Sequence, residues 1–79
     1  MVNMKTNVSI KYSSIEEYRE IEKKLVELGY VNDSNYTEEH ITILKLDRVT
    51  IFSDESFWIM DWSLYDDITY NSLEEFLKD

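Results

Sequence analysis

The chain has 79 residues, a single histidine, no cysteine and a formal net charge of −9 at pH 7, and 43% of its residues are hydrophobic. A chain of this length forms one domain, residues 1–79, with a small core that neither a disulfide framework nor a structural zinc site supports. The excess of acidic residues argues against direct binding to nucleic acid or to an anionic membrane, because the surface repels phosphate groups.

The first part of the chain predicts a strand followed by a long helix. Residues 6–12 alternate between polar and apolar side chains, which is typical of a strand with one buried face. Ser14 and Glu17 then form a capping box, and a second such box occurs one residue earlier. Apolar residues follow at spacings of three and four and predict a helix of about four turns. Gly29, the only glycine, marks its end, because glycine takes the left-handed C′ conformation without strain.

The middle of the chain predicts a loop and two strands. Residues 30–39 are polar and lack periodicity, so we expect a loop there, with at most a short strand or turn at residues 30–31. Residues 40–46 and residues 49–52 are rich in β-branched side chains, which predicts two strands joined by a tight or slightly wider turn. Residues 53–56 predict the next turn, because Ser and Asp side chains bond to their own backbone.

Residues 57–62 form the densest apolar stretch and hold both tryptophans. A strand here has two partly apolar faces, so it is central to a sheet or one of its faces is a contact surface. The faces are Trp58, Met60 and Trp62 on one side and Phe57, Ile59 and Asp61 on the other. We expect the tryptophan face to pack under the long helix. Phe57 and Ile59 then form an exposed apolar patch ringed by acids.

The last part of the chain predicts a short strand at residues 68–70 and a short helix at residues 71–77, where Ser72 and Glu75 form another capping box. The fold class is therefore α+β. We expect an antiparallel sheet of three to five strands with one long helix packed on one face and a short C-terminal helix, in the order β-α-β-β-β-α.

The acidic residues are unevenly distributed. Residues 49–79 contain eight acids and one base, whereas residues 1–48 contain nine acids and seven bases. This predicts a binding surface for a basic partner, with carboxylates as charge contacts and aromatic side chains as anchors. The alternative is an idle acidic surface that keeps a small protein in solution. The candidate partner-binding residues are Asp54, Glu55, Phe57, Asp61, Tyr65, Asp66 and Asp67.

The sequence predicts no enzyme and no cofactor. It contains no G-x-S-x-G motif, no glycine-rich phosphate loop and no cysteine nucleophile. His40 has no second histidine or cysteine with which to bind a metal, so we interpret it as a residue at a strand edge. The acids between residues 54 and 67 lack the glycine that a calcium loop needs.

The sequence also bears on location. The N-terminal residues lack the apolar stretch of a secretory signal, and no apolar run approaches the ~20 residues of a membrane span. We therefore expect a protein of the host cytoplasm, without a membrane partner.

The chain resembles a group of proteins in three segments, namely residues 25–30, the strand pair that follows, and residues 68–77. In these segments the chain resembles the small acidic α+β proteins encoded by phages and prophages of low-GC Gram-positive bacteria. Some of these inhibit host defence or host DNA metabolism, including anti-CRISPR proteins and DNA mimics. The resemblance implies an inhibitor of a host nucleic-acid-binding protein. It carries over no functional residue.

Three hypotheses follow from these observations. The first is a non-enzymatic inhibitor of phage or mobile-element origin that binds the basic groove of a host nucleic-acid-handling or defence protein. The second is a self-associating structural or accessory phage protein with a homodimer interface on the free sheet face. The third is a small-ligand or nucleotide-sequestering protein, in which aromatic side chains stack on a base.

Overall fold

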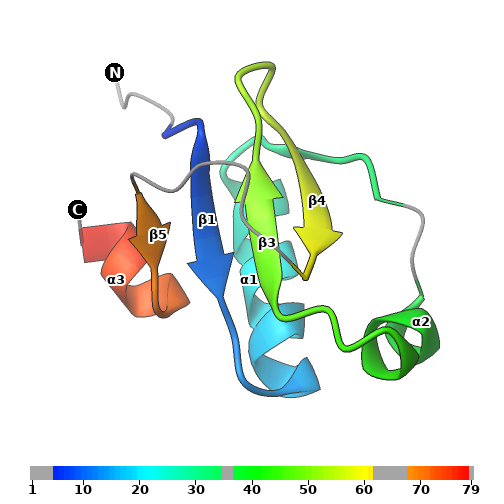
Figure 1. Ribbon diagram of the computed structural model, residues 1–79. Helices are drawn as coiled ribbons and strands as arrows, with labels where there is room; N and C mark the ends of the chain where they lie inside the picture. The colour runs from blue at the N-terminus through cyan, green and yellow to red at the C-terminus, as the bar shows by residue number, and fades with distance from the viewer. Residues whose placement is uncertain (1–4, 35–36, 62–67, 79) are drawn as a thin grey trace.

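A computed structural model describes residues 5–34, 37–61 and 68–78 of the chain (Figure 1). Over these residues the chain forms one sheet of five strands and three helices, which confirms the α+β class. In chain order the elements are β1 (Val8–Lys11), α1 (Ile15–Glu27), β2 (Val31–Asn32), α2 (Glu38–Ile43), β3 (Arg48–Ile51), β4 (Ser56–Met60), β5 (Thr69–Tyr70) and α3 (Leu73–Lys78).

The sheet is mixed, not antiparallel as predicted. Its strand order is β2-β4-β3-β1-β5. β3 pairs antiparallel with β1 and β4, whereas β2 is parallel to β4 and β5 is parallel to β1. β3 therefore runs against the other four strands. The parallel direction of β2 has a simple cause. The crossover helix α1 returns the chain to the end of the sheet where β1 began, so β2 runs in the same direction as β1.

The predicted long helix is confirmed together with both of its caps. The Ser14 hydroxyl accepts a hydrogen bond from the backbone N–H of Glu17 at 3.2 Å, which begins α1. Gly29 follows the helix with φ of 103°. The N–H of Tyr30 donates to the carbonyl of Leu25 at 3.0 Å, and the N–H of Gly29 donates to the carbonyl of Val26 at 3.1 Å. These two bonds form a Schellman motif, which needs a left-handed residue at the position of Gly29.

The predicted strand over residues 40–46 is wrong, because α2 occupies the first part of this segment. The Thr37 hydroxyl caps the helix by accepting the N–H of His40 at 3.2 Å, and α2 has acids in its first turn. The β-branched residues favour a strand by local propensity, but α2 buries Ile41 in the core and its capping satisfies the backbone. His40 is therefore a helix residue and does not lie at a strand edge.

The predicted turn at residues 53–56 is confirmed as the hairpin between β3 and β4. The N–H of Phe52 donates to the carbonyl of Ser56 at 2.9 Å, and the N–H of Glu55 donates to the carbonyl of Phe52 at 3.0 Å. Glu55 takes φ of 68°, as expected for a three-residue hairpin that closes with a left-handed residue. The hairpin sets the pairing of Ile51 with Phe57.

The faces of β4 are opposite to those predicted. Phe57 is 0% exposed and Ile59 is 2% exposed, because their register partners Ile51 and Val49 lie on the face that α1 covers. Trp58 and Met60 lie on the other face and are only partly buried. Trp62 lies outside the described residues. Phe57 and Ile59 therefore belong to the core and form no exposed patch.

The predicted C-terminal strand and helix are confirmed. The Ser72 hydroxyl accepts the N–H of Glu75 at 3.2 Å at the start of α3. Phe76 of α3 is buried and packs edge-on against Tyr70, with ring centroids 5.5 Å apart. Since Tyr70 is the register partner of Ile10 on the core face, α3 packs on the same side of the sheet as α1 (Figure 1). Among the described residues, no helix is both long enough and apolar enough to cross a membrane.

Candidate functional site

The structure does not bring the predicted partner-binding residues together. Asp54 and Glu55 lie in the β3–β4 turn, whereas Asp61 directly follows the far end of β4. At about 3.3 Å per residue, the strand separates these acids by roughly 15 Å or more. Phe57 is fully buried and offers no surface anchor. The remaining predicted residues lie outside the described part of the chain; they are Tyr65, Asp66 and Asp67.

Asp54 has a local structural role. Its carboxylate accepts hydrogen bonds from the Ser56 hydroxyl at 2.6 Å and from the Ser56 backbone N–H at 3.1 Å. These two bonds lower the pKa of Asp54, because they stabilise the charged form. The acid therefore shapes the turn that precedes β4, as expected of an Asp at this place in a hairpin.

A groove between α1 and α3 combines apolar and charged groups on one concave surface. It has a volume of about 510 Å³. Its apolar side chains are Ile21 of α1 with Leu73 and Leu77 of α3, and its acids are Glu16, Glu17, Glu20 and Glu74. Ser72 and Lys78 complete the lining. The groove is therefore apolar at its centre and mainly acidic at its rim.

The spacing of residues along the two helices builds this groove. Glu16 and Glu20 are one turn apart on α1, and Leu73 and Leu77 are one turn apart on α3, so each pair lies on one side of its helix. Phe76 anchors α3 by packing into the core, and Leu73, three residues earlier on the same side of the helix, is partly buried against that core. Ile21 is 1% exposed and closes the floor from α1.

The rim retains net negative charge. In the described part of the chain, the side chains of Glu16 and Glu20 make no hydrogen bond or ion pair, and like charges one turn apart on a helix repel each other. Glu17 accepts the Ser13 hydroxyl at 2.5 Å. Lys78, the one base in the lining, pairs with Glu74 at 3.0 Å. Arg19 interacts electrostatically with Glu16, and bases of α1 line the adjoining depression that Glu16 and Glu20 also border, so part of the charge of the two carboxylates is offset from that side.

An adjoining depression of about 640 Å³ shares part of this lining and has mixed charge. Its bases are Arg19, Lys23 and Lys24. Two of them are already paired, Arg19 with Glu38 and Lys24 with Glu27 at 3.8 Å. The surface on this side of α1 therefore has mixed charge, whereas the lining of the groove between α1 and α3 is mainly acidic.

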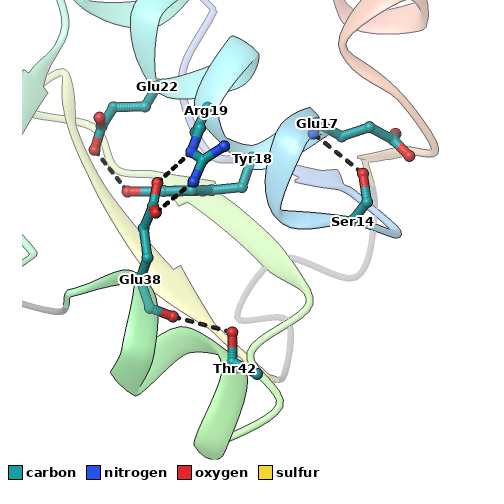
Figure 2. A network of polar contacts seen from close by, with 7 residues as sticks. All are labelled: Ser14, Glu17, Tyr18, Arg19, Glu22, Glu38 and Thr42. Carbon is teal, nitrogen blue, oxygen red and sulfur yellow. Dashed lines mark hydrogen bonds and ion pairs between the residues drawn. The ribbon is translucent and has the colours of Figure 1, made fainter.

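Figure 2 shows how Arg19 is held, and with it how α2 is fastened to α1. The guanidinium donates two hydrogen bonds to the carboxylate of Glu38, at 2.5 and 2.7 Å. This contact raises the pKa of Arg19 and lowers the pKa of Glu38, since each charge stabilises the other. Beside them, the Tyr18 hydroxyl donates to Glu22 at 2.6 Å, and the pKa of Tyr18 is raised by burial first and by this carboxylate second. On this side of α1, the charges of Arg19 and Glu38 neutralise each other.

The second surface of interest is the sheet face that α1 does not cover. Trp58 and Met60 are partly buried there, next to Thr50 and Arg48 in the register of β3. Lys11 of β1 pairs in register with Arg48. This face therefore carries bases beside its apolar side chains, and it differs in charge from the α1–α3 groove.

Sequence reasoning missed the groove, although its residues left a signal. Glu16 and Glu20 fall on the polar side of the predicted helix, and Ser72 is recognised only as a cap. The missed signal is the pair Leu73 and Leu77, which widens the apolar side of the short C-terminal helix beyond the core residue Phe76. In the part of the chain that the structure describes, no group of three or more His, Cys, Asp or Glu side chains is placed to hold a metal ion.

Comparison with models of protein families, with curated protein sequences and with solved structures finds no match to this chain. The functional assignment therefore depends on the geometry and the charges described above.

Proposed function

We propose that the protein is a non-enzymatic inhibitor of phage or mobile-element origin, which acts in the host cytoplasm and binds a basic surface of a nucleic-acid-handling protein. The single observation that carries the proposal is the rim of the α1–α3 groove, where the carboxylates of Glu16 and Glu20 are exposed beside apolar side chains and make no ion pair in the described part of the chain. The proposed origin depends on the resemblance of residues 25–30 and 68–77 to small acidic phage proteins.

The chemistry of the rim supports a basic protein as the partner. Arg and Lys side chains that bind phosphate also bind carboxylate, through charge-assisted hydrogen bonds. A net charge of −9 attracts such a surface over a distance and repels nucleic acid. The inhibitor thus occupies the place of the phosphate backbone on its partner.

The lining of the groove supports binding in preference to catalysis. Its residues are carboxylates, aliphatic side chains, one lysine and Ser72. The Ser72 hydroxyl accepts a backbone N–H as a helix cap, and within this lining no histidine stands next to it as a base. The arrangement thus resembles an interface with an apolar centre and a polar rim.

A competition assay with two charge-matched variants tests the proposal. Host nucleic-acid-binding proteins are bound to a fluorescent duplex, and the chain is titrated until the duplex is released, as read by anisotropy. We expect wild type to displace the duplex from at least one of them, and E16K/E20K to do so about tenfold less well or worse, a loss of about 1.4 kcal/mol. The control variant D33K/E39K changes the net charge equally at exposed residues away from the groove and should behave as wild type.

Salt provides the second readout of the same assay. Exposed charge pairs are screened over about 3 Å at 1 M ionic strength, so binding should weaken steeply between about 0.1 and 1 M. Displacement that is equal for wild type and E16K/E20K, or binding of the chain that persists unchanged at 1 M salt, contradicts the proposal.

A further inference from the structure

We infer that the α1–α3 groove receives one helix of the partner, and that this helix is amphipathic and basic. This inference rests on the proposed function and names the structural element that the acidic rim recognises. It follows from three properties of the groove, namely its apolar centre, the charge of its rim and the kind of backbone that lines it.

The centre of the groove fits an apolar helix stripe. Leu73 and Leu77 are four residues apart on α3, which is about 6 Å along the helix axis at about 1.5 Å per residue. A second helix packed alongside presents its own apolar residues at the same interval. Ile21 closes the floor, whereas Leu77 is 43% exposed and remains accessible.

The rim selects the charge of that helix. Four carboxylates surround the apolar centre, and the one lysine among them already pairs with Glu74. An acidic helix is repelled, whereas Lys or Arg on either side of an apolar stripe meets Glu16 and Glu20, which make no ion pair in the described part of the chain. Charge complementarity therefore requires a basic helix.

The backbone of the lining favours a helix over an extended segment. All of the lining residues belong to α1, to α3 or to the cap of α3, so no strand edge faces the groove. An extended peptide binds mainly by adding its backbone N–H and C=O groups to a free edge. A helix satisfies its own backbone groups and needs only side-chain contacts, which is what this groove offers.

Three labelled peptides of equal length, the first two also of equal charge, test this inference by fluorescence anisotropy at low salt. The first carries Leu at positions i, i+4, i+7 and i+11 with Lys and Arg on both flanks. The second has the same composition, with the leucines distributed around the helix. The third carries Glu in place of each base. We expect the first to bind at least about tenfold more tightly than the second, and the third not to bind.

Two variants of the protein locate the site. L77S should weaken binding of the first peptide about tenfold, because it removes apolar surface from the groove. V26S changes an exposed apolar residue of α1 outside the groove and should bind as wild type. E16Q/E20Q provides an independent reading should L77S unfold, which circular dichroism detects, and it should weaken the first peptide more than V26S does.

The outcomes separate this inference from the proposed function. Equal binding of the first and second peptides overturns the helix inference, while displacement of duplex from host proteins still supports the proposed function. Failure of all three peptides to bind also overturns the inference. Selective binding of the first peptide, weakened by L77S but not by V26S, supports the groove even if no host protein releases its duplex, in which case the proposed function alone fails.

Discussion

Phe57 and Trp58 are neighbours in β4 whose side chains face opposite sides of the sheet. Phe57 contacts the cluster beneath α1 and is fully buried, whereas Trp58 is partly exposed on the other face. Burial, not the size of the ring, determines how much each contributes to stability, because a cavity forms only where neighbouring side chains enclose the site.

This difference predicts unequal losses of stability for two alanine variants. F57A should lower the free energy of unfolding by about 3–5 kcal/mol, which is a large part of the total for a small domain. W58A should cost less than half as much, since part of its side chain is already in water. Urea denaturation followed by circular dichroism measures both, with F57L as a milder variant that should cost less than about 1.5 kcal/mol. A W58A variant less stable than F57A would show that the faces are assigned incorrectly.

At the scale of elements, α1 and α2 end in the same way with different residues. Gly29 follows α1 with φ of 103°, and Lys45 follows α2 with φ of 55°. After α2, the N–H of Leu46 donates to the carbonyl of Ile41 at 3.1 Å, as in a Schellman motif. A side chain with a Cβ atom is strained in this conformation by about 1–2 kcal/mol, so only the end of α1 has the residue that the motif prefers.

Exchanging these residue types should change stability in opposite directions. G29A should lower the free energy of unfolding by about 1 kcal/mol or more, and K45G should raise it by about 0.5–1 kcal/mol. K45A is the matched control and should leave stability close to that of wild type, because alanine has the same Cβ strain as lysine. Denaturation midpoints measure all three, and a destabilised K45G would contradict the account of the α2 terminus.

At the scale of the whole molecule, the net charge of −9 acts against folding. Ion pairs offset some of it, such as Arg19 with Glu38 and Lys78 with Glu74, but Glu16 and Glu20 repel each other and make no ion pair in the described part of the chain. A compact state concentrates this charge, so self-repulsion lowers its stability. The acidic groove thus has a cost in stability.

Salt should therefore stabilise the free protein. Raising the ionic strength from about 0.01 to 0.15 M shortens the screening length from about 30 to about 8 Å, and we expect the thermal midpoint to rise. A gain of about 1 kcal/mol corresponds to about 4–8 °C for a domain of this size. Scanning calorimetry measures the change. E16Q/E20Q should start higher at low salt and gain less, and a midpoint that is independent of salt in wild type would contradict this expectation.

The sequence alone determined the elements whose signals are local. These elements are the caps of α1 at Ser14 and Gly29, the turn around Asp54 and the start of α3 at Ser72. Each depends on a side chain or a backbone angle within a few residues, so reading the chain in order was enough to place them. The excess of acid is likewise a property of composition.

Only the tertiary structure decided how these elements face one another. The side of β4 that is buried depends on its register with β3, which places Phe57 opposite Ile51, and an alternating strand permits either choice. The helical state of α2 depends on burying Ile41 against the rest of the core. The groove exists because Phe76 and α1 pack on the same side of the sheet, which places Leu73 beside Glu16 although the two residues are far apart in the chain. Such contacts depend on long-range packing, and no local pattern encodes them.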